Sequence, residues 1–173
     1  MRRVASGLVI IAAATALAAC GQPAANDTAA TSTAAAPTAT AAPAAKAAVN
    51  PEKAALLASL PAPYNTGDLE NGQKQFQLCR SCHTITEGGA NMTGPNLYGI
   101  FGRTAGTVEK FRYSEPLKAS GIVWDGAKLD QWLADPRGFL PGNRMSFMGV
   151  KDAKNRVDLI AYLKVETGHK PGG

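Results

Sequence analysis

The clearest hydrophobic periodicity lies near the C-terminus, where apolar residues recur at i, i+3, i+4 and i+7. The residues of this stripe are Val157, Ile160, Ala161 and Lys164. Leu159 and Leu163 form a neighbouring row, and the lysine is expected to bury its alkyl stem while its ammonium reaches water. We therefore predict a helix that Asp152 caps at its start and that Gly168 ends after Thr167.

Two shorter helices are predicted earlier in the chain. Asp68 can cap a helix that runs to about Leu78, because its carboxylate can accept from the free N–H groups of a first turn. Asp125 can cap another, which should end before Asp135-Pro136 since the residue ahead of a proline is pushed out of the helical region. The apolar face of that helix consists of Leu129, Trp132 and Leu133. A further short helix could span residues 51–60, and no segment alternates like a strand over a useful length.

The N-terminus has the pattern of an export signal. Residues 1–19 begin with two arginines and continue as a short, alanine-rich apolar stretch. That stretch is short for a permanent membrane span, which needs about 20 strongly apolar residues. Leu17-Ala18-Ala19-Cys20 resembles a bacterial lipoprotein cleavage site, so we expect cleavage before Cys20 and lipidation of its thiol. An ordinary signal that happens to contain a cysteine and an uncleaved anchor are the alternatives.

Composition separates a tether from one folded domain. Residues 20–63 are rich in Ala, Thr and Pro and contain no aromatic residue, so they cannot bury enough apolar surface to offset the entropy of ordering. All eleven aromatic residues lie in residues 64–173, where we place the domain. The formal charge of +5 falls to +3 once Arg2 and Arg3 leave with the signal. The remaining basic residues are dispersed, which favours a surface of mixed sign over a nucleic-acid interface.

The candidate chemistry is concentrated in Cys79-Arg80-Ser81-Cys82-His83, the Cys-x-x-Cys-His signature of covalent c-type haem attachment. Two thiols one helical turn apart can add to the vinyl groups on one porphyrin edge, and the adjacent histidine can then be the fifth ligand of the iron. A thioredoxin-like site would need a βαβ context, which the flanking sequence lacks. A structural zinc would need four ligands. Outside the motif only Cys20 and His169 could complete that set.

The iron needs a sixth ligand unless its second axial position is open. His169 belongs to a predicted helix end, and Met92 lies nine residues after His83 on the same loop, from which it could hardly reach the opposite haem face. Met145 and Met148 follow a Pro-Gly turn that can present a side chain inward. A methionine in a loop is ordinarily an apolar filler. Residue spacing leaves both of these methionines as candidates.

From about Thr66 to Thr167 the chain resembles class I c-type cytochromes, close to the mitochondrial form and its short bacterial relatives. The motifs that carry the resemblance, in order, are Cys79-Arg80-Ser81-Cys82-His83, Thr93-Gly94-Pro95-Asn96-Leu97, Phe101-Gly102-Arg103, Tyr113-Ser114, Gly121-Ile122-Val123-Trp124, Leu140-Pro141-Gly142-Asn143-Arg144-Met145 and Asp158-Leu159-Ile160-Ala161-Tyr162-Leu163. The resemblance implies a mainly α fold, with about three to five short helices and loops wrapped around one covalently bound haem. It also implies Met145 as the sixth ligand, with Met148 left to packing.

The resemblance further implies roles around the haem. The carbonyl of Pro95 would accept the second ring N–H of His83. The implied partners of a haem propionate are Arg103, Tyr113 and Trp124, with Ser114 and Asn143 as lesser ones. Phe147 would seal the haem edge beside Met145. The sequence departs from the mitochondrial pattern on the methionine side, with Leu117 in place of the common Asn, Trp132 in place of Tyr and Asn143 in place of Thr.

Two filled axial positions and no candidate acid or base beside them indicate an electron carrier, not an enzyme. The implied partners are a quinol-oxidising cytochrome bc complex as donor and a terminal oxidase as acceptor. The lipidated Cys20 would hold a monomer on the periplasmic side of a bacterial membrane, with the inner membrane as the expected site, and no nucleic-acid partner is expected. The alternative is a haem peroxidase or a gas-binding sensor with a labile sixth ligand. A fixed relay subunit of a larger complex is a third hypothesis.

Overall fold

The computed structural model describes residues 50–169. The predicted signal peptide, Cys20 and the tether up to residue 49 lie outside the described residues and stay predictions. The described helices are α1 (Pro51–Ala58), the 3-10 turn η1 (Tyr64–Thr66), α2 (Leu69–Phe76), α3 (Glu115–Ala119), α4 (Gly126–Ala134), α5 (Pro136–Phe139) and α6 (Ala153–Glu166). Within residues 50–169 the only strand-like pairing is an isolated bridge between Thr104 and Val123. The mainly α fold predicted from the sequence is confirmed.

The three predicted helix starts are confirmed with their caps. The Asp68 carboxylate accepts from the N–H groups of Glu70 and Asn71 at the start of α2. Asp125 and Asp152 cap α4 and α6 in the same way, each accepting from an N–H three residues further on. Each cap satisfies N–H groups that have no partner within the helix.

Two short helices, α3 and α5, were not expected. Each has a proline in its first turn, where the missing N–H is harmless and the fixed φ suits a helix. Asp135 also caps α5, since its side chain accepts from the N–H of Gly138 at 3.1 Å. Asp135-Pro136 therefore ends one helix and begins another, whereas the sequence predicted only the end of a helix there. These additions raise the number of α-helices in the described part to six.

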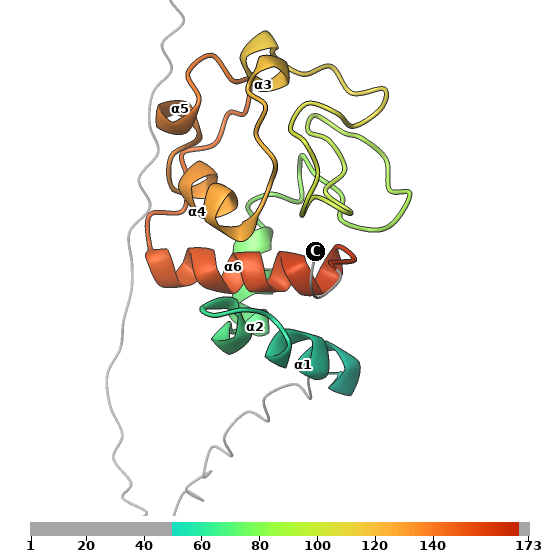
Figure 1. Ribbon diagram of the computed structural model, residues 1–173, viewed down its shortest axis with the longest axis vertical. Coiled ribbons are helices and arrows are strands. Elements are labelled where there is room, and N and C mark those ends of the chain that lie inside the picture. Colours follow the sequence, from blue (N-terminus) through green and yellow to red (C-terminus); the bar gives the residue numbers. More distant parts are fainter. Residues whose placement is uncertain (1–49, 170–173) are drawn as a thin grey trace, which may run out of the picture. The chain divides into compact units, whose positions relative to one another are not determined.

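Helix α6 runs across the middle of the domain, with α1 and α2 on one side of it and α4 on the other (Figure 1). Its buried residues include Ile160, Ala161 and Lys164 of the predicted stripe and Leu159 and Leu163 of the neighbouring row, so the predicted buried face is confirmed, with Val157 half-buried. Leu159, Ile160 and Ala161 are all fully buried. The prediction that the Lys164 ammonium reaches water was wrong, because the residue is only 5% exposed.

The packed structure begins before residue 64, the expected start of the domain. Leu56, Leu57 and Leu60 contribute to a small apolar cluster with Ala161 and Val165 of α6. An ion pair of 2.6 Å between Lys53 of α1 and Glu166 of α6 joins these two helices. Helix α1 thus covers the side of α6 that faces away from α4, although it belongs to the segment predicted as tether.

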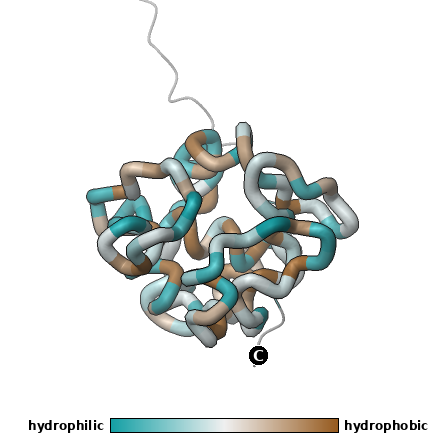
Figure 2. The backbone as a smooth tube through the Cα atoms, turned by 90° about the horizontal axis from the view of Figure 1, so that it is seen from above, coloured by the Kyte–Doolittle hydropathy of each residue, from teal (hydrophilic) through white to brown (hydrophobic). Residues whose placement is uncertain are grey.

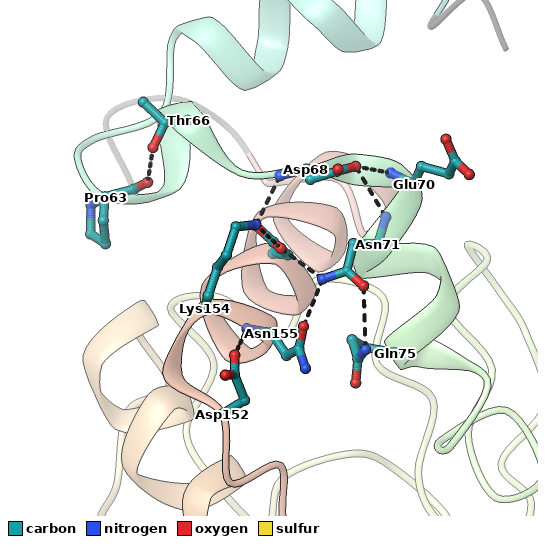
Figure 3. Close-up of polar contacts among 10 residues, drawn as sticks. Pro63, Thr66, Asp68, Glu70, Asn71, Gln75, Asp152, Lys154 and Asn155 are labelled. Carbon is teal, nitrogen blue, oxygen red and sulfur yellow. Dashed lines mark hydrogen bonds and ion pairs between the residues drawn. The ribbon is translucent and has the colours of Figure 1, made fainter. Parts of the chain in front are cut away.

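Helices α2 and α6 cross closely at Gly72, where a Cβ atom would overlap the carbonyl oxygen of Asp158. The buried Asp158 carboxylate ties the two helices together, and Figure 3 shows its partners Asp68, Asn71 and Lys154. It accepts from the N–H of Asp68 at 2.9 Å, the amide of Asn71 at 2.7 Å and the ammonium of Lys154 at 2.6 Å. Burial acts to raise the pKa of Asp158, but these hydrogen bonds and the Lys154 charge outweigh it and lower the pKa below its usual value.

Replacing Asp158 with Asn in the haem-loaded protein is expected to lower the free energy of unfolding by about 2–4 kcal/mol at pH 7, since one buried donor would face another. Because the folded pKa is lowered, the carboxylate stabilises the fold above its unfolded pKa of about 3.9, and this contribution is lost as the pH falls through the lowered value. Urea titrations at pH 7 and pH 3 measure both effects. Lys154→Met is the control, because Lys154 is exposed and its loss should cost much less. Equal losses in the two variants would contradict this role for the buried carboxylate.

Loops make up most of the chain between α2 and α4. Figure 2 shows the domain from above, where winding segments of mixed hydropathy dominate the visible trace. Backbone hydrogen bonds hold two of these segments together, from Gly102 to Trp124 at 2.7 Å and from Trp124 to Arg103 at 2.9 Å. These contacts fix Arg103 beside Trp124, ahead of α4.

Candidate functional site

A cavity of about 740 Å³ lies among the loops, α4 and α6. This volume is in the range of small-molecule and cofactor sites, which is about 300–1,000 Å³. All the predicted haem-site residues within the described part line this one cavity. They are Cys79, Cys82, His83, Pro95, Arg103, Tyr113, Ser114, Trp124, Asn143, Met145 and Phe147. Met92 lines it too, whereas neither Met148 nor His169 does.

The two cysteines lie on one helical turn that follows α2. The N–H groups of Cys82 and His83 both donate to the carbonyl of Cys79, at 3.0 and 2.9 Å. The thiols form no disulfide. Burial, with a smaller contribution from Cys82, raises the pKa of Cys79 to about 11. A reactive thioredoxin-like cysteine has a lowered pKa instead. Within residues 50–169 no cluster of three or more His, Cys, Asp or Glu side chains is placed to hold a metal ion, so the described structure offers no zinc site.

His83 is held in one orientation by its neighbours. Its Nδ1 lies 2.7 Å from the carbonyl oxygen of Pro95. A carbonyl only accepts, so Nδ1 carries the hydrogen and Nε2 is the nitrogen left for iron. Burial lowers the pKa of His83, against the opposing effect of the Pro95 hydrogen bond, and so favours the neutral ring. Gly94 packs against the face of this ring, because a Cβ there would overlap the imidazole.

Met145 lies on the loop after α5, and Asn143 shapes the turn that leads to it. The Asn143 amide donates to the carbonyls of Pro136 and Leu140 at 2.7 and 2.8 Å. Its side-chain oxygen accepts from the N–H of Met145 at 2.8 Å. Asn143 thus positions Met145. Both of its amide hydrogens are used in these contacts, so the structure adds no support for the implied contact with a propionate, which stays a prediction.

The cavity wall near Met145 is largely apolar. The three positions that depart from the mitochondrial pattern, Leu117, Trp132 and Asn143, all line the cavity. The Trp132 ring packs edge-to-face between Trp124 and Phe139, with centroid distances of 5.4 and 6.0 Å. A dry, apolar wall of this kind suits the face of a porphyrin.

A polar corner of the cavity suits an anionic group. The Ser114 hydroxyl is buried and has no hydrogen-bond partner within the described residues. The half-buried Arg103 guanidinium donates to the carbonyls of Tyr98 and Asn96 at 2.9 and 3.1 Å. Burial lowers the pKa of Arg103 from its ordinary value and raises that of Tyr113, while each group partly opposes the shift of the other. An orphaned hydroxyl and a guanidinium that line the same cavity fit a haem carboxylate, so the residues present fit a c-type haem.

Sequence reasoning missed the role of Asn96. The side-chain amide of Asn96 donates to the Thr84 hydroxyl at 2.6 Å and to the carbonyl of Thr86 at 3.0 Å. Its backbone carbonyl accepts from Arg103. This residue therefore joins the loop after His83 to the polar corner. The only signal was its place in the motif Thr93-Gly94-Pro95-Asn96-Leu97, where an Asn after Pro reads as an ordinary turn residue.

The fold and the cavity together define a small helical domain built around one covalently attached haem. The cytochrome c family model matches residues 69–165, and the chain belongs to this family. Cytochrome c 2.1 of Caenorhabditis briggsae is 44% identical over 111 residues, which are 64% of this chain and 95% of that protein. Cytochrome c2 of Blastochloris viridis is 43% identical over 109 residues, covering 63% and 86%.

A solved structure agrees with this assignment. Cytochrome cH from Methylobacterium extorquens matches with a TM-score of 0.53 and 44% identity, over 57% of this chain and 98% of that one. Membership of the family implies one covalently bound c-type haem, and it makes the protein a haem-based electron carrier.

Proposed function

We propose that the protein carries single electrons on a haem c that Cys79 and Cys82 hold, with His83 and Met145 as the two axial ligands. The observation that carries this proposal is that all four side chains line one cavity, whereas Met148 is 76% exposed and does not line it. When bound, the haem supplies a one-electron couple between ferric and ferrous iron.

The chain's own residues would keep this couple reversible. The Pro95 carbonyl and Gly94 restrain the His83 ring, and Asn143 restrains the loop of Met145. Ligands that stay in place when the charge of the iron changes keep reorganisation small. The apolar wall excludes water, while Arg103 and Ser114 would bind a propionate.

The place of electron transfer is part of the proposal. A lipid on Cys20 would hold the protein on the periplasmic side of the inner membrane, as a monomer that moves on its tether. No helix within residues 50–169 is long and apolar enough to cross a membrane. Confinement to one membrane raises the effective concentration of partners there. We propose a cytochrome bc complex as the donor and a terminal oxidase as the acceptor, which the similarity to cytochromes c2 and cH supports.

An optical redox titration of the haem-loaded protein, ended by adding carbon monoxide, tests this function. We expect one one-electron wave at positive potential, because His/Met ligation raises the potential. The reduced spectrum should not change with carbon monoxide, since both axial positions are filled. A spectrum that shifts with carbon monoxide would contradict the proposal and would favour a peroxidase or a gas-binding sensor.

A further inference from the structure

The ammonium of Lys164 is buried on α6, on a face that the haem cavity does not use. The residue is 5% exposed, and no carboxylate oxygen in residues 50–169 lies within ion-pair distance of it. Its Nζ lies 4.2 Å from the ring centroid of Phe101 and 5.6 Å from that of Tyr64. Aromatic faces offset part of the cost of burying a cation, but they do not replace a hydrogen-bond acceptor.

The nearest acceptor is His169, whose Nε2 lies 3.4 Å from Nζ of Lys164. An ammonium can only donate, so this contact requires Nε2 without a hydrogen. The His169 ring also packs edge-to-face on Phe101, with centroids 5.4 Å apart. Gly168 lets the chain turn back at this point, because its φ is +72° and a Cβ would meet the ring of Tyr98.

This turn also contacts the loop that enters the haem cavity. The carbonyl of the buried Thr167 accepts from the N–H of Gly99 at 2.8 Å. Arg103, four residues further along that loop, donates back to the Tyr98 carbonyl and lines the cavity. The end of α6 and the polar corner of the cavity are thus connected through residues 98–103.

We propose that Lys164 is a positioning residue. Its hydrogen bond to unprotonated His169 holds the loop that carries Arg103 in place, and protonation of His169 breaks this hydrogen bond. The proposal rests on the haem-carrier function proposed above. It adds a proton-dependent influence on the haem, since Arg103 contributes positive charge to the corner that would bind a propionate. If the Arg103 cation moves away from the haem, it stabilises the reduced form less. Loss of the Lys164–His169 hydrogen bond therefore lowers the reduction potential.

The groups around the pair determine when His169 takes up a proton. Burial and the Lys164 charge both lower the pKa of His169, so the folded protein prefers the neutral ring. Burial lowers the pKa of Lys164, and Asp125 at the start of α4 opposes this. Tyr64 from η1 and Tyr98 from the loop are the other titratable groups beside the pair. Protonated His169 would place two cations side by side without an acceptor, so this hydrogen bond is lost as the pH falls through the lowered pKa of His169.

Histidine NMR titration of the haem-loaded full chain tests the contact directly. The sequence has two histidines, and His83 would be bound to iron, so His169 is the ring that titrates. We expect its pKa to lie below the ordinary value and to rise toward that value in Lys164→Met, while Lys164→Arg keeps it low. A His169 pKa that Lys164→Met leaves unchanged would overturn the proposal.

The reduction potential measured between pH 5 and pH 8 tests the consequence. The wild-type potential should fall at low pH with an inflection at the pKa of His169. His169→Gln keeps an acceptor that does not titrate, so it should match the wild type at pH 8 and show no such inflection. An inflection that persists in His169→Gln would overturn the proposal. A carbon monoxide shift in the wild type would refute the carrier function alone, because the His169 titration is read without electron transfer.

Discussion

Replacing both Cys79 and Cys82 with alanine is expected to leave the domain largely unfolded. Without covalent attachment the haem is no longer retained, and the cavity of about 740 Å³ lacks the group that fills it. An empty cavity leaves its apolar lining without packing partners, at about 24 cal/mol per Å³ where the void stays dry. Water entering the cavity reduces this cost, but small domains are stable by only about 5–15 kcal/mol. Much of the core of this domain is therefore the haem itself.

Far-UV circular dichroism with thermal melting measures this loss, and acid–acetone extraction shows whether haem stays with the chain. Ser81→Ala is the matched control, because Ser81 is exposed between the two cysteines and should leave both haem and folding intact. A double variant that melts as cooperatively as the wild type would show that the protein alone forms this core.

The second large effect is expected from Met145→Ala. Loss of the thioether should open the sixth coordination position, so that the reduced protein binds carbon monoxide. The reduction potential should fall by a few tenths of a volt, since axial ligands set haem potentials over a range of about 0.8 V. Folding should be retained, because Met145 lies on a loop and Cys79, Cys82 and His83 still hold the haem.

Met148→Ala is the matched control for this experiment. Met148 is three residues away on the same loop, but it is 76% exposed and outside the cavity lining. The potential and the carbon monoxide response of Met148→Ala should equal those of the wild type. If Met148→Ala, and not Met145→Ala, opened the iron to carbon monoxide, the ligand assignment would be reversed.

The capped starts of α2, α4 and α6 could be read from the sequence, because a cap depends on residues within one helical turn. The short helix α5 could not, since Pro136 both ends α4 and begins the next helix. The sequence also predicts the covalent haem site, because attachment would require Cys79, Cys82 and His83 at short, fixed spacing.

Contacts between distant segments were decided by the tertiary structure alone. Residue spacing left Met145 and Met148 open, and only the folded loop places Met145 in the cavity and Met148 outside it. The periodicity of α6 predicted a buried face that includes Lys164, but only the folded chain places the ammonium of Lys164 beside Phe101, Tyr64 and His169. A local pattern shows that a side chain can be buried, but its surroundings depend on segments that only folding brings together. That is why the covalent haem site could be predicted from neighbouring residues, while the Lys164–His169 contact could be seen only in the folded chain.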